Sequence, residues 1–485
     1  MGGLVAAGHP LTAEAGAAVL RDGGNAVDAA VAAMLMSWVA EPLLTGPGAG
    51  GYMLVAGFAD RPVLLDFFVA APGIGRDPGQ PGPELTPVVV NFGDAVQVFN
   101  CGAASVGVPG CPAGIGAAMS RWGTRRLASL AAPAAAAARA GVDVNAPQGY
   151  VFDLLEGILS STPEAVREFG ARERFASAEL AATIELLGRE GAEPFYRGAV
   201  AEAIVDWLEP RGGLLTRADL AAYAAVERAP VWARYRGRTV VTNPPPSAGG
   251  TLIALTLALL DRTAGPPSLD EVVEAMERAQ AERTDAFVAG LDEPDFAHRF
   301  LRSRLGATTH ISVVDDAGRA CSATCTNGEG SGIVVPGTGI HLNNIMGEED
   351  LNPLGFHVFP AGRRMPSMMA PTVVLRDGQV ELVLGSAGSN RIRSAILQTI
   401  IGVVDRGETA AAAVEAPRLH FEDGVVYAEP GIDLAPLRAA GREVAPFRAR
   451  NLFFGGVQAV ERSSAGKLTG GGDPRRGGAV AVAPA

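Results

Sequence analysis

The middle of the chain contains the stretch ATTHISVVD, which runs from Ala307 to Asp315. Its alternating, β-branched residues predict a β-strand, and a turn through Gly318 leads to a second predicted strand, Arg319 to Thr326. Two threonines at the start of a strand are common and by themselves indicate only strand formation. If the chain were cut after Ala307, however, Thr308 would hold a hydroxyl nucleophile and a free α-amine on one residue. An α-amine has a pKa near about 7.7–8.0, so it can act as a general base at neutral pH.

The composition is that of a globular protein with a large core. The chain has 485 residues, of which 48% are hydrophobic and 19% are charged, and its net charge is −12. This charge argues against a nucleic-acid partner, because phosphate binding needs clustered Lys and Arg. The longest apolar stretch near the start, residues 29–39, is too short to span a bilayer, so no membrane partner is expected.

The cysteines and the N-terminal sequence bear on localisation. Cys101, Cys111, Cys321 and Cys325 form no CxxC motif, and no His lies at metal-ligand spacing from them. We therefore expect reduced, buried thiols and no metal. The first residues lack the basic region of a secretory signal, so a cytoplasmic protein is expected.

Helices are expected before Thr308 and strand pairs after it. Residues 12–40 predict one or two helices, and much of 113–289 is also helical in pattern. The glycine-rich segment Thr45–Gly51 lacks the Lys-Ser/Thr of a phosphate-binding loop, which favours a tight buried turn. Residues 73–100, which begin with Pro and Gly, predict mostly loop. These patterns predict one layered α+β body whose two halves interlock.

Ordered motifs occur along nearly the whole length of the chain. They are Gly8–Leu11, Gly23–Ala30, Gly48–Val55, Val108–Gly110, Leu215–Gly237, Pro244–Gly250, Thr308–Asp315, Leu342–Asn344, Ala370–Thr372, Gly385–Gly388 and Asp473–Arg475. With these motifs the chain resembles the γ-glutamyltransferase (γ-glutamyl transpeptidase) family of N-terminal-nucleophile enzymes. The resemblance implies a four-layer αββα sandwich, made as a precursor that cuts itself before the nucleophile. The large chain would be 1–307 and the small chain 308–485, and the two would stay associated.

The resemblance also implies the catalytic residues. Thr308 matches the nucleophile, and Thr326 matches a Thr that hydrogen-bonds to it and orients it. Gly388 and Ser389 match a Gly-Gly pair whose backbone N–H groups form the oxyanion hole. A side chain at Ser389 keeps the N–H but restricts the backbone. No cofactor is implied.

The substrate-binding residues depart from the family pattern. Members that bind a γ-glutamyl group hold its α-carboxylate with the Arg of an Asp-(Phe/Tyr)-Arg-Glu-x-Ala-Pro motif, where this chain has Phe68. A Ser-Ser pair that also holds the carboxylate is Ser367-Met368 here. A buried carboxylate without its Arg partner costs about 3–5 kcal/mol. We therefore expect either a different acyl group or a replacement cation, for which Arg391 and Arg364 are candidates unless they form structural ion pairs.

Other candidate residues are less decisive. Glu348, or less directly Asp350, aligns with the acidic residue that binds the α-amino group, and Asn327 aligns with a family Asn near the site. His310 and His420 are interpreted mainly as packing residues, with a supporting hydrogen bond as the alternative for His310.

Three functions are consistent with these residues. The first is an amidase or acyltransferase of this family that acts on small-molecule amides with an acyl group other than γ-glutamyl. The second is a true γ-glutamyl hydrolase or transferase acting on glutathione-like compounds. The third is a scaffold that keeps the fold without catalysis, which the intact Thr308 argues against.

Overall fold

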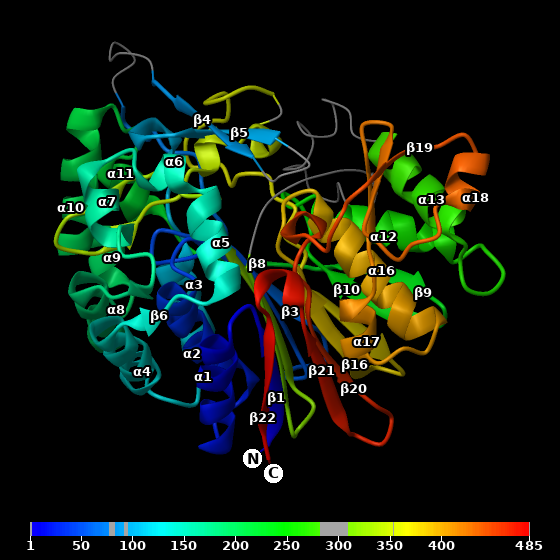
Figure 1. Cartoon of the computed structure of the whole chain (residues 1–485). Helices are drawn as coiled ribbons and strands as arrows, with labels where there is room; N and C mark the ends of the chain where they lie inside the picture. The colour runs from blue at the N-terminus through cyan, green and yellow to red at the C-terminus, as the bar shows by residue number, and fades with distance from the viewer. Residues whose placement is uncertain (1, 77–82, 92–95, 282–308, 353, 485) are drawn as a thin grey trace.

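The computed structural model of the chain describes residues 2–76, 83–91, 96–281, 309–352 and 354–484 (Figure 1). Ala307 and Thr308, the predicted cleavage site and nucleophile, lie outside the described residues. The strand that follows them is described from Thr309 onward.

The predicted hairpin lies inside a large antiparallel sheet. Strand β11 (Thr309–Asp315) pairs with β12 (Ala320–Thr326), and every residue of both strands is buried. Among the described residues this sheet has seven strands in the order β22-β1-β11-β12-β2-β3-β8. The remaining strands are β22 (Ala479–Ala483), β1 (Gly3–Ala7), β2 (Gly50–Ala56), β3 (Val63–Phe67) and β8 (Val226–Arg228).

A second antiparallel sheet contacts the first. Its described strands are, in order, β21 (Leu468–Gly472), β20 (Gln458–Arg462), β16 (Gln379–Gly385), β15 (Thr372–Arg376), β10 (Arg238–Thr242) and β9 (Val231–Tyr235). Strands β11 and β12 contact β16, and β1 contacts β20 and β21. Each sheet therefore combines strands from before and after position 308.

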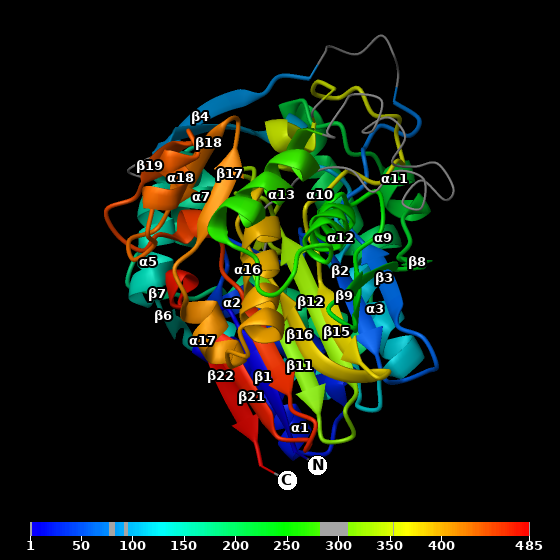
Figure 2. The same ribbon diagram turned by 90° about the vertical axis from the view of Figure 1, so that its right-hand side faces the viewer.

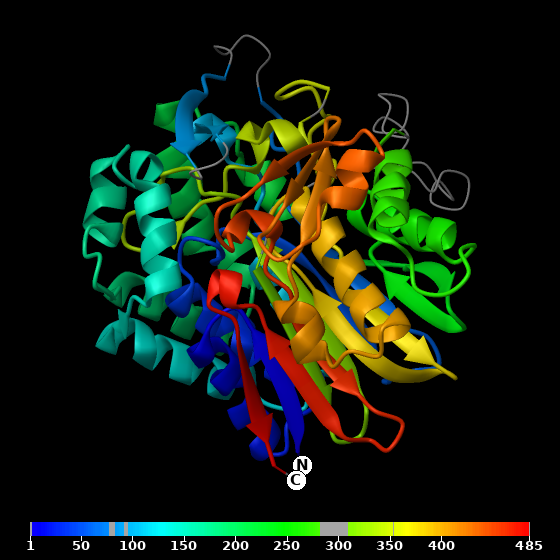
Figure 3. The ribbon, with the colours of Figure 1, turned by 45° about the vertical axis from the view of Figure 1, so that its right-hand side comes forward.

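Helices cover the outer sides of both sheets (Figures 1 and 3). On the first sheet, α1 (Pro10–Arg21) contacts β1 and β22, and α2 (Ala26–Ala40) contacts β11 and β12. On the second, α12 (Gly249–Leu260) contacts β9 and β10, and α16 (Arg391–Asp405) contacts β16. The predicted combination of helices and paired strands in one body is confirmed.

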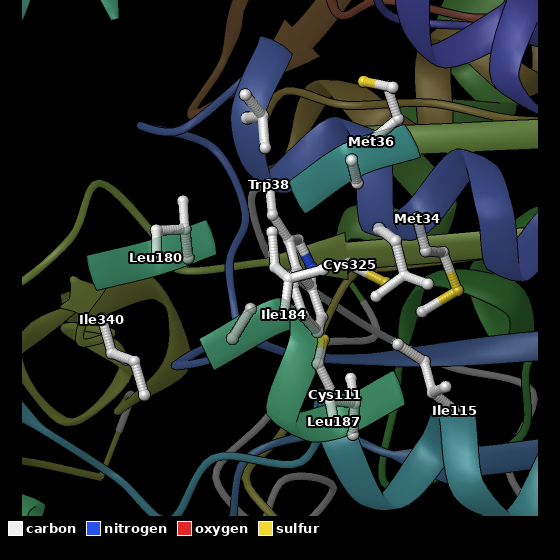
Figure 4. Packing of buried hydrophobic residues seen from close by; sticks show 14 of the residues in the cluster. Met34, Met36, Trp38, Cys111, Ile115, Leu180, Ile184, Leu187, Cys325 and Ile340 are labelled. Atoms are coloured by element: carbon white, nitrogen blue, oxygen red, sulfur yellow. The ribbon is translucent and has the colours of Figure 1, made fainter. Parts of the chain in front are cut away.

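Helix α2 lies in the hydrophobic core between the first sheet and the helices that cover it. Asn25 and Asp28 form a capping box at its start, and all of its residues are buried, as the apolar sequence predicts. Further helices pack behind it: α3 (Cys111–Trp122), α4 (Leu127–Ala140) and α8 (Ala178–Glu190). Figure 4 shows Trp38 of α2 among side chains from α3, α8 and β12.

The expectation of a loop over residues 73–100 is wrong in part. Strands β4 (Thr86–Asn91) and β5 (Val96–Cys101) pair as a separate two-stranded sheet. The Val88–Val90 run has high β-propensity, and pairing with β5 outweighs the Pro- and Gly-rich beginning of the segment. The helical pattern that begins near residue 113 corresponds to separate helices, because α3 ends at Trp122 and α4 begins at Leu127.

The remaining elements extend the helical layers and the rim. The helices are α5 (Ala146–Leu154), α6 (Glu156–Leu159), α7 (Pro163–Phe169), α9 (Glu193–Arg197), α10 (Ala199–Leu208), α11 (Arg217–Ala222), α13 (Leu269–Ala281), α17 (Ala410–Glu415) and α18 (Ala435–Ala439). The short strands are β6 (Val142–Asp143), β7 (Arg174–Phe175), β13 (Val334–Val335), β14 (Ile340–His341), β17 (Leu419–Glu422), β18 (Val425–Ala428) and β19 (Glu443–Pro446).

The two ends of the chain lie side by side, and the cysteines lie inside the protein. The first and last strands, β1 and β22, pair with each other, so the two ends lie together (Figure 2). All four cysteines fall in the described part of the chain and are buried and unpaired, as predicted. Within that part, no helix combines the length and the apolar character that a membrane span requires.

Candidate active site

The predicted catalytic segments meet where three strands begin or end. Strand β11 starts at Thr309, which lies opposite Cys325, the neighbour of Thr326 at the end of β12. Strand β16 ends at Gly385, and a side chain on Gly385 would collide with the ring of His310. The starts and ends of these strands therefore share one end of the two sheets.

The end of β12 forms a tight buried turn beside Glu348. The Thr326 hydroxyl accepts a hydrogen bond from Gly328 N at 2.7 Å. Gly328 has a φ of +64° and lies against the Glu348 carboxylate, which would collide with any larger residue at this position. Asn327 donates its backbone N–H to Leu44 O at 3.0 Å. The structure thus brings together three predicted residues, Thr326, Asn327 and Glu348, while the side chain of Asp350 is not described.

The predicted oxyanion loop connects β16 to α16. Ala387 and Gly456 exchange backbone hydrogen bonds of 3.2 and 3.1 Å, which fix the loop against a neighbouring segment. Gly388 has a φ of +115°, and a Cβ there would approach Gly455 Cα to 2.9 Å. Ser389 has a φ of +53°, a left-handed conformation that is unfavourable for a residue with a side chain.

Ser389→Gly is expected to stabilise the protein while keeping its activity. The left-handed conformation costs about 1–2 kcal/mol for an L-residue, whereas the extra freedom of an unfolded Gly costs about 0.5–1 kcal/mol. The net gain is therefore up to about 1 kcal/mol, measurable as a higher urea midpoint. A lower midpoint would show that the Ser389 side chain stabilises the loop by more than the backbone strain.

A buried carboxylate that the sequence did not single out lies next to Thr309. Glu41 follows α2, is 1% exposed, and accepts hydrogen bonds from the hydroxyls of Thr12 and Thr309, both at 2.9 Å. Burial raises the pKa of Glu41 to about 7, against opposing effects of these hydroxyls and of the Arg476 guanidinium. The available signal was that Glu41 is the one charged residue of the run from Ala29 to Leu43, in which Ser37 is the other polar residue.

Glu41 is expected to make stability fall as the pH rises. The pKa of Glu41 is 4.5 ordinarily and about 7 in the folded protein. The folded state therefore holds the proton more tightly than the unfolded state, and this contribution to stability is complete below pH 4.5 and is lost as the pH rises to about 7. A shift of this size corresponds to about 3 kcal/mol. Relative to Glu41→Gln, the wild-type protein should therefore lose stability between pH 5 and 8, as measured by urea midpoints. Parallel curves for the two proteins would contradict this expectation.

Arg476 approaches the oxyanion loop from the C-terminal segment. A Cβ on Gly388 would lie 3.3 Å from Arg476 Nη2, and one on Gly456 would meet the Arg476 stem. Burial, and then the nearby Arg391, lower the pKa of Arg476 to about 10. Two glycines thus make room for the Arg476 side chain beside the predicted oxyanion loop.

A buried ion network supports the same loop. Asp473 is fully buried, contacts Arg418 Nη1 at 2.6 Å and Arg475 Nη1 at 3.2 Å, and accepts Val457 N at 2.8 Å. Arg475 Nε also donates to Glu429 at 2.8 Å. Burial alone would raise the pKa of Asp473, but the two arginines and the backbone amides together lower it.

The residues at the expected substrate anchor are core residues in this structure. Phe68 is fully buried, and its ring stacks on that of Tyr52 with centroids 5.6 Å apart. Met368 is fully buried in the same core cluster. Ser367 accepts a hydrogen bond from Met369 N at 3.0 Å. The Arg position of the motif is therefore filled by an aromatic ring among apolar side chains.

The two replacement cations make structural contacts. Arg364 Nε lies 3.4 Å from Asp66 Oδ1, and its guanidinium lies over the Tyr223 ring at 4.2 Å. Arg391 Nε donates to Phe453 O at 3.0 Å, and the group lies over that ring. Arg364 thus forms the structural ion pair of the alternative, whereas Arg391 contacts a backbone carbonyl and an aromatic ring.

The histidines form hydrogen bonds inside the core. His310 contacts the hydroxyls of Thr324 at 2.8 Å and Ser312 at 2.9 Å, and burial lowers its pKa to about 3, which keeps the ring neutral. His420 contacts Ser394 at 2.7 Å and Glu422 at 3.3 Å. His310 is therefore buried, as the packing interpretation predicts, and its ring contacts hydroxyls of β11 and β12.

Other features of the described residues lie away from these groups. A cavity of about 490 Å³ between α1, α2 and α4 is lined mainly by apolar residues and contains none of the predicted site residues. Within the described ranges, no group of three His, Cys, Asp or Glu side chains could hold a metal ion.

Comparisons with known proteins identify the family. A family model described as gamma-glutamyltranspeptidase matches residues 12–307 and 296–483. The chain belongs to the γ-glutamyltranspeptidase family. The predicted family is thus confirmed, and with it the enzyme class of amide hydrolases and acyltransferases.

Relatives in the γ-glutamyltranspeptidase family include two kinds of enzyme. The chain is 31% identical to the glutathione hydrolase proenzyme of Escherichia coli (strain K12), over 98% of this chain and 90% of that protein. It is also 31% identical to the Acylase ACY 1 proenzyme of Pseudomonas sp. (strain SE83), over 96% and 91%. The crystal structure of cephalosporin acylase from Bacillus halodurans matches with a TM-score of 0.84 and 25% identity, over 99% and 95%. Both substrate hypotheses have relatives of the corresponding kind, so these relatives do not decide between them.

Proposed function

We propose that the protein is a self-processing γ-glutamyltranspeptidase-family enzyme that cleaves amides whose acyl group is not a standard γ-glutamyl group. Processing would occur between Ala307 and Thr308. The E. coli and Pseudomonas relatives are both named proenzymes, which supports this step. The two products, 1–307 and 308–485, would remain one four-layer N-terminal-nucleophile sandwich, because each of the two sheets contains strands from both products.

The proposed chemistry uses an ester intermediate. Thr308 Oγ1 attacks the amide carbonyl carbon, and its proton passes to the Thr308 α-amine. The backbone N–H groups of Gly388 and Ser389 hold the tetrahedral oxyanion, where loss of one such donor costs about 10²–10³ in rate. The C–N bond then breaks, and the leaving amine takes the proton from the α-ammonium. Water or a second amine attacks the ester, gives its proton to the α-amine, and releases the acyl product as Thr308 Oγ1 is reprotonated.

Phe68 is the observation that carries the choice of substrate. A γ-glutamyl group brings a carboxylate that needs a charged partner when it is buried. At the Arg position Phe68 is fully buried and stacked on Tyr52, while Met368 replaces the second Ser. Arg364 and Arg391 are engaged in the contacts described above. An acyl chain without the α-amino and α-carboxylate groups would meet this apolar surface at lower cost.

A matched series of p-nitroanilides tests the proposal. The γ-glutamyl, glutaryl and pentanoyl anilides differ only in the charged groups that the acyl chain carries. We expect kcat/KM for the pentanoyl anilide, which carries no carboxylate, to exceed that for γ-glutamyl by at least about 100-fold, the factor that corresponds to about 3 kcal/mol. The Thr308→Ala variant is the control for background hydrolysis. If γ-glutamyl anilide is the best of the three, the enzyme is instead a γ-glutamyl hydrolase or transferase, as in the E. coli relative.

A further inference from the structure

Glu41 joins three separate segments at the start of β11. Its two carboxylate oxygens accept one hydroxyl each: Oε1 from Thr12 in α1, and Oε2 from Thr309 in β11, both at 2.9 Å. The side chain is 1% exposed and Thr309 is 4% exposed, so water competes little for these hydrogen bonds. The carboxylate therefore connects the helical layer directly to the strand that follows the proposed nucleophile.

The backbone of Glu41 holds the carboxylate in a fixed place. Glu41 N donates to Ser37 O at 2.8 Å, and Glu41 O accepts from Leu44 N at 3.0 Å. Leu44 O in turn accepts the backbone N–H of Asn327, the residue after Thr326. The same turn thus contacts the end of β12 as well as the start of β11.

Gly8 leaves the space that the carboxylate occupies. A Cβ on Gly8 would collide with Glu41 Oε2 and would lie 3.2 Å from Thr309 Oγ1. Gly8 has no left-handed backbone conformation that would require glycine. The close approach of the carboxylate is the physical reason for a residue without a side chain here.

We propose that Glu41 is a positioning residue, which holds Thr309 and thereby the Thr308 nucleophile that precedes it in the chain. The proposal rests on the proposed function, because Thr308 would become a chain terminus after cleavage. A terminus frays unless it is tied down, and Thr309 is the second residue of the new chain. The Glu41–Thr309 hydrogen bond would then join the two processed chains at the point where the nucleophile must be held.

Three single substitutions separate positioning from general stability. Thr309→Val removes the hydroxyl at nearly constant volume, and Thr309→Ser retains it. Thr12→Val is the matched control, since it removes the other hydrogen bond to the same carboxylate without altering β11. For Thr309→Val we expect kcat to fall about 10- to 100-fold with KM nearly unchanged, because small displacements of a reacting group cost about this much. Thr309→Ser should restore most of the activity, and Thr12→Val should lose little.

A double-mutant cycle assigns the loss to Glu41. If Thr309→Val and Glu41→Ala act through the same hydrogen bond, the double variant should lose no more kcat than the more damaging single variant. Additive losses, or equal losses in Thr12→Val and Thr309→Val, would overturn the positioning role.

Hydrogen exchange tests the proposal independently of catalysis. In the uncut Thr308→Ala chain, addition of Glu41→Ala or Thr309→Val should speed exchange at the start of β11 selectively, while Thr12→Val should not. Unchanged exchange in β11 would overturn the proposal even if the enzyme is active. If the wild-type protein is neither cut nor active, but the selective change in exchange is seen in the Thr308→Ala chain, the proposed function is contradicted. The role of Glu41 in holding the start of β11 then still stands.

Discussion

Thr308→Ala is expected to yield a single uncut chain of 485 residues with amide turnover reduced by at least about 10⁴-fold. The substitution removes the proposed nucleophile for both self-cleavage and substrate attack. Intact mass spectrometry after long incubation and a p-nitroanilide assay measure the two effects. The wild-type protein should separate under denaturing conditions into chains 1–307 and 308–485.

Thr308→Ser is the matched control for this prediction. It keeps a hydroxyl and, after cleavage, an α-amine, so cleavage and turnover should persist at a reduced rate. Cleavage of the Ala variant at the same position would show that Thr308 is not the nucleophile of processing. A wild-type chain that stays uncut and inactive would favour the scaffold interpretation.

Asp473→Ala is expected to destabilise the protein by about 3–5 kcal/mol, because it leaves buried guanidinium groups without their carboxylate. Asp473 has no exposed surface and contacts Arg418 and Arg475, which are themselves nearly buried. It also accepts Val457 N, next to the segment that pairs with Ala387 in the oxyanion loop. We therefore expect a lower urea midpoint and, in the folded fraction, a lower kcat.

An exposed ion pair provides the control for Asp473. Asp206 pairs with Arg217, but both side chains are more than half exposed, so Asp206→Ala should change the midpoint little. Both substitutions are best made in the uncut Thr308→Ala chain, where unfolding involves one polypeptide. Similar midpoints for Asp473→Ala and Asp206→Ala would show that the buried network contributes little to stability.

Local sequence patterns predicted the elements that have strong local signals. The strands on either side of Gly318 and the helices within residues 12–40 follow from short-range hydrogen bonding and periodicity, and all are found. The pairing of β4 with β5 was missed because the Pro- and Gly-rich beginning of residues 73–100 was given more weight than the β-branched residues at Val88–Val90. The interpretation of His310 as a packing residue followed from strand alternation, but its partners on β12 did not.

The sequence by itself determined the family, the candidate nucleophile Thr308, and the absence of the usual Arg at Phe68, since ordered motifs and single substitutions are local facts of the chain. Only the tertiary structure decided where these residues stand in relation to one another. It placed Phe68 on Tyr52, Arg476 beside Gly388, and Glu41 on Thr309, which is 268 residues away in the chain. Such contacts depend on how two sheets and their helices close around one another, and burial then changes the chemistry, as it does for the Glu41 carboxylate.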